Sequence, residues 1–232
     1  MERKIITTAD GSKTIQLVGL NEHYHSVHGA LQEAEHVFIK HGLLHAIDHF
    51  STKNQPISIL EIGFGSGLNA LATLVASEKH SVSIAYVGVE AYPVSKEEVL
   101  ELDYATLFQE ARYQDLNNQI HLVPWGTFQK ISPHFSLLKQ QKMFKDITDT
   151  NTHHLIYFDA FGPRVQPDLW TESVFKIMFD ALMPSGVLVT YSAKGSVRRA
   201  MQAVGFTVEK LPGPPGKREM LRATKQTATP SL

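Results

Sequence analysis

A glycine-rich loop between an apolar strand and a helix constrains the fold of this chain most. Residues 57–62 predict a short strand and residues 68–77 predict a helix, joined by Glu61-Ile62-Gly63-Phe64-Gly65-Ser66-Gly67-Leu68-Asn69. Glycines let the backbone turn tightly and let a ligand approach closely. In an open parallel sheet such a loop lies at the carboxyl ends of the strands, where ligands bind. The stretch therefore predicts an α/β fold with a ligand crevice at this loop.

The rest of the chain continues this alternation. Further strands are predicted at residues 84–90, 120–123, 155–159 and 187–191, and helices at 96–102, 169–182 and 196–204. A closing antiparallel pair is predicted at 207–210 and 219–224, joined by the Pro/Gly-rich loop 212–216. Buried apolar strands that alternate with helices indicate a mostly parallel sheet covered on both faces.

The first 50 residues form a predicted extension before this alternation begins. Asp10-Gly11 separates two strand-like segments, 4–10 and 13–18, and is a hairpin turn signal. Residues 29–50 show apolar positions at helical spacing, and Gly42 is a point where this helix would divide in two. We therefore expect an N-terminal hairpin and helix extension at 1–50, a main domain at 51–226 and a flexible tail at 227–232.

Length and composition narrow the class of protein. The chain has 232 residues, of which 43% are hydrophobic and none is cysteine. It is long enough for one domain with a sizeable core, and disulfides, a thiolate nucleophile and iron–sulfur clusters are excluded. No apolar run approaches the roughly 20 residues needed to span a bilayer, and the N-terminus lacks the apolar core of a signal peptide. A cytoplasmic protein without membrane contact is expected.

The charge distribution is uneven although the net charge is −1. Residues 194–225 contain eight basic and two acidic side chains, so they carry +6, while the remainder carries −7 from 14 basic and 21 acidic residues. Such asymmetry predicts a local anion-binding face, and a solvated helix and hairpin is the alternative.

The composition of the glycine loop indicates which ligand it holds. A dinucleotide fingerprint requires a third glycine where Leu68 stands, and a pyrophosphate site avoids an acid such as Glu61 two residues before the first glycine. A ligand with an ammonium group and no phosphate suits this loop better. S-adenosylmethionine has these properties, whereas a tight turn without any ligand is the alternative.

Two further acids follow predicted strands. Glu90 ends the strand 84–90, where a carboxylate can accept both hydroxyls of a ribose. Asp159 follows the most apolar strand and precedes Phe161 and a Gly-Pro turn. A carboxylate there could hold an amine so that its lone pair faces a methyl donor. Simple capping of the following turn is the alternative role for Asp159.

The 12 histidines do not form a recognisable metal motif. His41, His45 and His49 are spaced to share a helix face, and a second group precedes that helix. No H-E-x-x-H sequence is present, and no carboxylate or thiolate completes a ligand set. We expect no metal site.

These features together resemble the methyltransferase domain of the MnmC family in its stand-alone, MnmD-like form, from about Tyr24 to Thr224. The glycine loop is common among methyltransferases, whereas two other stretches are much more specific to this family. These are Asp159-Ala160-Phe161-Gly162-Pro163 with the following Pro167-Asp168-Leu169-Trp170, and Gly216-Lys217-Arg218-Glu219-Met220-Leu221. The resemblance implies an α/β, Rossmann-like S-adenosylmethionine-dependent methyltransferase with a mostly parallel seven-stranded sheet and an antiparallel edge strand.

The resemblance also implies a reaction. Family members transfer a methyl group from S-adenosylmethionine to the aminomethyl nitrogen on carbon 5 of the wobble uridine of tRNA, often 2-thiolated. Bifunctional members carry an additional flavin-dependent oxidase domain, and because this chain ends earlier, methyl transfer alone is expected. The tRNA anticodon stem-loop is the expected partner.

The implied site comprises three groups. Catalysis is assigned to Asp159 and Phe161, where Asp159 orients the amine and Phe161 forms an apolar wall or stacks on the uracil. Cofactor binding is assigned to Glu61, Gly63, Phe64, Gly65, Gly67, Asn69, Glu90, Trp125, Gly126 and Asp159. RNA phosphates are assigned to Lys194, Arg198, Arg199, Lys217 and Arg218.

One departure from the family is expected near the adenine. Family members commonly have Gly-Asp after the third strand, and Trp125-Gly126-Thr127 places threonine at the position of the acid. Two alternative functions remain open at this point. One is a methyltransferase or aminopropyltransferase for a small amine, and the other is a non-catalytic RNA-binding module.

Overall fold

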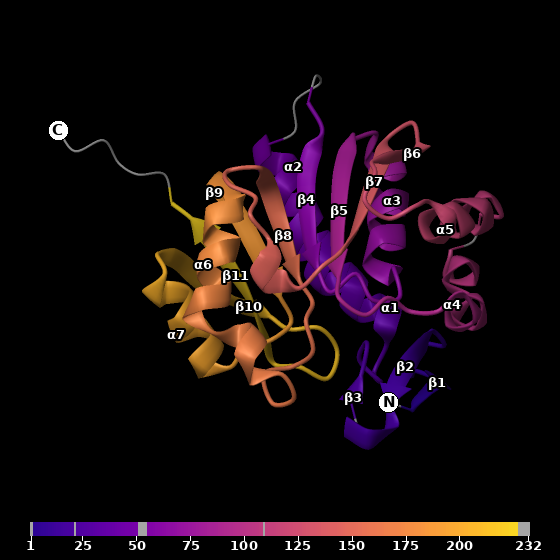
Figure 1. Cartoon of the computed structure of the whole chain (residues 1–232), viewed down its shortest axis with the longest axis horizontal. Coiled ribbons are helices and arrows are strands. Elements are labelled where there is room, and N and C mark those ends of the chain that lie inside the picture. Colours follow the sequence, from indigo (N-terminus) through magenta and orange to yellow (C-terminus); the bar gives the residue numbers. More distant parts are fainter. Residues whose placement is uncertain (1, 21, 51–54, 109, 227–232) are drawn as a thin grey trace.

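The computed structural model describes residues 2–20, 22–50, 55–108 and 110–226, which form a central sheet with helices on both faces (Figure 1). Five parallel strands make the middle of the sheet: β7 (Phe135–Gln141), β5 (Ile84–Glu90), β4 (Ile57–Ile62), β8 (His153–Phe158) and β9 (Leu182–Thr190). Three antiparallel strands extend its edges: β11 (Glu219–Lys225) on β9, β10 (Phe206–Pro212) on β11, and β6 (Gln129–Ser132) on β7. The order is β10-β11-β9-β8-β4-β5-β7-β6.

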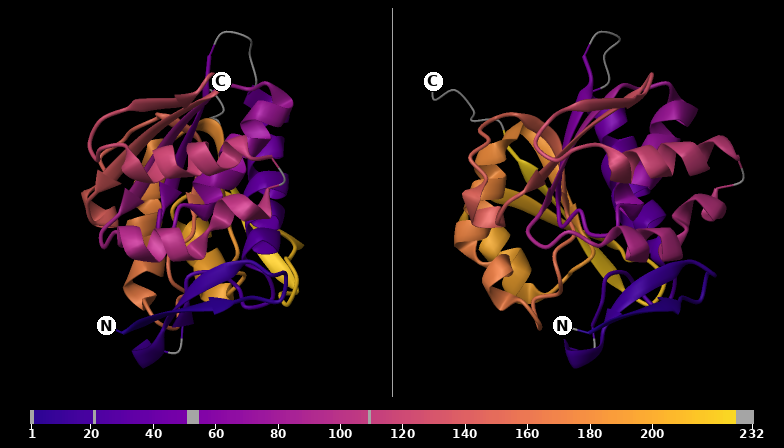
Figure 2. Two further views of the ribbon diagram at one scale, coloured as in Figure 1. Left: turned by 90° about the vertical axis from the view of Figure 1, so that its right-hand side faces the viewer. Right: turned by 45° about the vertical axis from the view of Figure 1, so that its right-hand side comes forward.

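Alternation along the strands divides the core into two layers. In β4, Ile59 faces one layer and Leu60 the other, because successive side chains point to opposite faces of a sheet. The first layer is covered by α3 (Leu68–His80), α5 (Arg112–Leu122) and the long helix of residues 30–50, and the second by α6 (Glu172–Ala181) and α7 (Gly195–Ala203). Figure 2 shows both layers from the side.

The long helix is continuous. It consists of α1 (Ala30–Glu33), a π-helical stretch at Ala34–Leu43 and α2 (Leu44–Phe50), so the predicted division at Gly42 is wrong. A Cβ at Gly42 would lie 3.0 Å from Val189 and 3.1 Å from Tyr157, which shows that the helix packs closely on β9 and β8 there. Gly42 therefore serves close packing rather than a break.

The strand predicted at 120–123 is also wrong, because Ile120 belongs to the last turn of α5. Tyr113, Asn117 and Ile120 are buried while Leu122 is 69% exposed, which is the burial pattern of an amphipathic helix. The third parallel strand is β7, and β6 precedes it, so the sheet has eight strands in the described residues where seven were expected. The predicted closing pair is confirmed as β10 and β11.

The N-terminal residues form a separate small sheet. It contains β1 (Arg3–Thr7), β2 (Lys13–Leu17) and β3 (Glu22–His23), so the predicted hairpin is confirmed. The sheet lies beyond one end of the central strands and beside α4 (Lys96–Leu102), to which Arg3 is joined by an ion pair with Glu98 at 2.9 Å (Figure 1). The predicted domain limits stay predictions, and residues 51–54 and 227–232 lie outside the described residues.

Candidate active site

The glycine loop turns sharply beside the end of β8. Gly63 has φ +88°, and a Cβ there would lie 2.7 Å from the carbonyl oxygen of Asp159. Only glycine fits this position without strain, so the loop passes directly against the segment that carries Asp159. The loop therefore brings Gly63, Gly65 and Asp159 to one place, as the sequence predicted.

Glu90 holds the loop from the neighbouring strand. Its carboxylate accepts hydrogen bonds from the backbone N–H groups of Gly65 at 3.0 Å and Tyr92 at 2.9 Å. Glu90 thus ends β5 in the position predicted for binding a ribose, and it faces the cavity described next.

A cavity of about 1100 Å³ lies between the carboxyl ends of the central strands and the N-terminal sheet. This volume accommodates a ligand of the size of a nucleoside with an amino acid chain. Six residues predicted for the site line it: Gly63, Phe64, Gly65, Glu90, Asp159 and Phe161. Others were not predicted, among them Tyr24, Tyr92, Met143, Phe144 and Tyr191. They come from segments whose apolar side chains carry no signal of their own in the sequence.

Asn69 joins two carboxylates beneath this cavity. Its Nδ2 donates to Glu61 Oε1 at 2.9 Å and to Asp159 Oδ2 at 2.8 Å. Glu61 and Asn69 are almost fully buried and do not line the cavity, so their direct contact with a cofactor stays a prediction. Burial raises the pKa of Glu61 well above its ordinary value, and Glu61 Oε2 has no hydrogen-bond partner. The structure indicates that both residues position Asp159 and the loop.

The adenine end of the cavity differs from the expectation. Trp125 and Gly126 do not line the cavity, because they precede β7 and Trp125 packs against the ring of Phe64. The parallel strand beside β5 is β7, which ends at Gln141, and the N–H of Lys142 donates to the carbonyl of Glu90 at 3.2 Å. Met143 and Phe144, which follow, do line the cavity. The comparison of Thr127 with a family acid therefore rested on the wrong strand assignment.

Asp159 has the properties of a group that handles a proton near neutral pH. Burial, and secondarily the charge of Glu33, raises the pKa of Asp159 to about 7, whereas the hydrogen bond from Asn69 and the charge of Lys217 lower it. The segment after Asp159 is anchored, since Trp170 Nε1 donates to the carbonyl of Phe161 at 2.8 Å. The Phe161 ring packs edge-on against Tyr24, with 5.1 Å between centroids.

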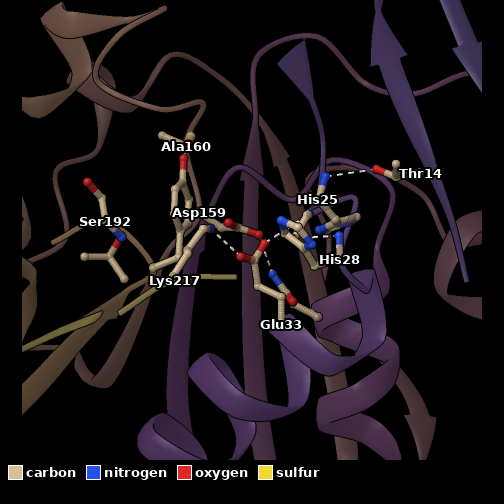
Figure 3. A network of polar contacts seen from close by, with 12 residues as sticks. Thr14, His25, His28, Glu33, Asp159, Ala160, Ser192 and Lys217 are labelled. Atoms are coloured by element: carbon tan, nitrogen blue, oxygen red, sulfur yellow. Dashed lines mark hydrogen bonds and ion pairs between the residues drawn. The ribbon is translucent and has the colours of Figure 1, made fainter. Parts of the chain in front are cut away.

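A second cavity of about 620 Å³ adjoins the first and shares Tyr24, His25, Gly162 and Tyr191 with it. Lys194, Lys217 and Arg218 line this second cavity. Lys217 donates a hydrogen bond to the buried Glu33, and Figure 3 shows Glu33, Lys217 and Asp159 pointing toward one another. No pattern in the sequence links Lys217 with Glu33, because the two residues are 184 positions apart.

The predicted phosphate contacts occupy different environments. Lys194, Arg199 and Arg218 are exposed, whereas Arg198 is half-buried and its Nε has no hydrogen-bond partner. Arg198 and Arg199 lie on α7 and do not line either cavity. The basic side chains thus surround the second cavity only in part.

Within the described ranges, no three His, Asp or Glu side chains form a group that could hold a metal ion, and no helix is both long and apolar enough to cross a membrane. The predicted histidine clusters have other contacts. His25 is half-buried, its Nε2 is 3.0 Å from Ser66 Oγ, and desolvation lowers its pKa to about 4.

Comparisons with known proteins agree with this geometry. A family described as S-adenosyl-L-methionine-dependent methyltransferase matches residues 118–226. The chain is 30% identical to the tRNA 5-methylaminomethyl-2-thiouridine biosynthesis bifunctional protein MnmC of Burkholderia mallei, over 94% of this chain and 34% of that protein. MnmC of Burkholderia pseudomallei gives the same values. The chain therefore spans about a third of the length of these relatives.

Solved structures confirm the fold. MNMC2 from Aquifex aeolicus superposes with a TM-score of 0.76 at 24% identity, covering all of this chain and 72% of that one. Spermidine synthase from Thermotoga maritima superposes with a TM-score of 0.58 at 18% identity, covering 96% of this chain and 69% of that one. The fold and the site define an S-adenosylmethionine-dependent methyltransferase. Within that class, the chain is similar over almost its whole length to a part of the MnmC proteins, which agrees with the resemblance seen in the sequence.

The site fits S-adenosylmethionine as its cofactor. Gly63 lets the loop pass against the segment after β8, so that Gly63, Gly65 and Asp159 line one cavity, and Glu90 lines the same cavity at the end of β5. With the cofactor bound in this cavity, Glu90 would accept the ribose hydroxyls, and Met143 and Phe144 would contact the adenine. Asp159 lines the same cavity.

Proposed function

We propose that this protein methylates the aminomethyl nitrogen on carbon 5 of the wobble uridine of tRNA. The observation that carries the proposal is the position of Asp159, which lines the cofactor cavity and lies beside Glu33 and Lys217 of the adjoining cavity. A carboxylate at this junction is suited to hold an amine against a methyl donor. The printed names of the Burkholderia relatives supply the acceptor, 5-methylaminomethyl-2-thiouridine biosynthesis in tRNA.

The chemistry requires a neutral amine and an aligned approach. S-adenosylmethionine supplies the methyl group, as the lone pair of the amine forms the N–C bond while the S–C bond breaks and leaves its electrons on sulfur. Asp159 orients the amine through its free carboxylate oxygen and accepts a proton, directly or through water. Phe161 and Tyr24 provide an apolar wall that excludes water from the reacting groups. The product leaves as a secondary ammonium group.

The tRNA would bind over the second cavity. The exposed Lys194, Arg199 and Arg218 are available for phosphates of the anticodon stem-loop, so binding is expected to weaken as salt rises. The wobble base has to leave the loop stack to enter the cavity. A cytoplasmic location follows from this substrate.

The test is to incubate the purified protein with labelled S-adenosylmethionine and tRNA from cells blocked at the aminomethyl stage, and to analyse the nucleosides by mass spectrometry. Label on the wobble uridine amine supports the proposal. Cofactor binding without label on tRNA would support a small amine as acceptor instead. Absence of cofactor binding would support an RNA-binding module without activity.

A further inference from the structure

Lys217 is not placed like a residue that binds phosphate. Its ammonium group is paired with Glu33, whose side chain is only 7% exposed, and lies 3.9 Å from the centre of the Tyr191 ring. To reach a phosphate at the surface, Lys217 would have to leave the buried carboxylate of Glu33 without its charge partner, which is strongly unfavourable. The basic groups free for phosphate at this cavity are Lys194 and Arg218, which are exposed.

The surrounding backbone fixes Lys217 in this position. Gly216 has φ +83°, and a Cβ there would overlap the ring of His28. The turn is closed by a hydrogen bond from Lys217 N–H to the carbonyl of Pro214 at 2.9 Å. Glu33 is held from the other side, since the N–H of Ser26 donates to its Oε1 at 3.2 Å. The pair is therefore a built part of the cavity wall.

The charges around Lys217 come from every element packed against it. They are Glu33 on α1, His25 and His28 before α1, Asp159 after β8, Tyr191 after β9, and Arg218 and Glu219 beside it in the chain. Glu33 and Asp159 alone would stabilise the ammonium form of an acceptor amine, which cannot attack a methyl group. A fixed positive charge beside the same point opposes that effect.

We propose that Lys217, held by Glu33 and Tyr191, is a positioning residue of the acceptor subsite that favours the neutral, nucleophilic form of the acceptor amine. The acceptor ammonium loses one proton to the Asp159 carboxylate or to water, and Lys217 keeps its own proton throughout. Its charge also favours the ionised form of Asp159, so both effects act in the same direction. The inference rests on the proposed function, because it concerns the same amine.

The experiment measures single-turnover methyl transfer to aminomethyl-uridine tRNA against pH, with saturating S-adenosylmethionine, for the wild type, Lys217→Met, Lys217→Arg and Glu33→Gln. In Lys217→Met the acid limb of the pH profile is expected to move to higher pH by about one unit. This is the size of pKa shift that loss of one nearby positive charge produces. Lys217→Arg is expected to restore the wild-type profile. Glu33→Gln, which removes a negative charge but keeps an acceptor for Lys217, is expected to move the limb down.

Lys176→Met is the matched control, since Lys176 forms an exposed ion pair with Asp180 on α6, away from the site, and its profile is expected to equal that of the wild type. Cofactor affinity, measured by calorimetry, is expected to stay unchanged in all variants. An unshifted profile together with a flatter salt dependence of tRNA binding in Lys217→Met would overturn the inference and make Lys217 a phosphate contact. If Lys217→Met does not fold, Glu33→Gln provides the test. A downward shift of its acid limb supports the inference, and an unshifted or upward limb overturns it. A wild type without methyl transfer would instead reject the proposed function.

Discussion

Asn69 donates a hydrogen bond to the carboxylate of Asp159 at 2.8 Å, and the same amide nitrogen donates to Glu61 at 2.9 Å. One side chain at the start of α3 therefore fixes the group at the centre of the site from below. The contact with Glu61 is buried, so water does not replace it readily when Asn69 is changed, whereas the contact with Asp159 borders the cavity.

Asn69→Ala is expected to lower both stability and turnover. The buried Glu61 loses its donor, which typically costs about 1–3 kcal/mol for an unsatisfied buried group, and Asp159 loses the contact that orients it. Thermal unfolding and kcat measure the two effects. Gln119→Ala on the exposed face of α5 is the control and is expected to change neither value. An Asn69→Ala protein with wild-type kcat would show that Asp159 is oriented by other contacts.

Asp159→Asn is expected to stabilise the protein at high pH while turnover falls. The folded pKa of Asp159 is raised from 3.8 to about 7, so its contribution to stability is full below pH 4 and is lost as pH rises to about 7. The rise in pKa from 3.8 to about 7 corresponds to a change of about 4 kcal/mol in the free energy of unfolding across this pH range. Chemical denaturation at pH 5 and pH 8 gives the free energy of unfolding. The variant should lose less stability between these values than the wild type, and equal losses would contradict the assignment.

Glu90→Ala is expected to weaken S-adenosylmethionine binding about 10- to 100-fold. The change removes the acceptor of the Gly65 and Tyr92 N–H groups and the group placed for the ribose hydroxyls. Calorimetric titration of the cofactor measures the effect. Glu101→Ala, on an exposed position of α4, is the control for loss of a carboxylate. Equal affinities of Glu90→Ala and the wild type would place the cofactor elsewhere.

Gly63→Ala is expected to destabilise the protein and to weaken cofactor binding. The new methyl group meets the carbonyl oxygen of Asp159 at 2.7 Å, and the positive φ adds roughly 1–2 kcal/mol of strain. Gly19→Ala is the matched control, because no atom lies within 4 Å of a Cβ there and its φ is not positive. Similar melting temperatures for the two variants would contradict the described geometry of the loop.

Phe144→Ala is expected to reduce cofactor affinity, whereas Thr127→Ala is not. Phe144 lines the cavity next to Glu90, and Thr127 is exposed outside it. The pair of variants compares the adenine position in the structure with the position inferred from the sequence alone. Weaker binding in Thr127→Ala, with normal binding in Phe144→Ala, would place the adenine beside Thr127, as the sequence predicted.

The sequence by itself determined many of the local elements and the glycine loop. The bounds of β4, β5 and α4 agree with the predicted ranges, because apolar strands, caps and glycines act over a few residues. Gly63, Gly65, Glu90 and Asp159 were placed together correctly, since the carboxyl ends of parallel strands meet at one edge of a sheet. The resemblance to the MnmC family was also evident from short motifs around Asp159 and Lys217.

Tertiary structure decided which segment forms the strand beside β5 and which distant side chains meet at the site. Ile120 and its neighbours are apolar enough for a strand, but packing of one face against α3 makes them a helix end, and β7 takes the place beside β5. The pairing of Lys217 with Glu33 joins residues 184 positions apart. The short-range patterns that predict helices and strands carry no information about such pairs. A basic residue that the sequence places among phosphate contacts thus lies against Glu33 and Tyr191, because only the folded chain brings these segments together.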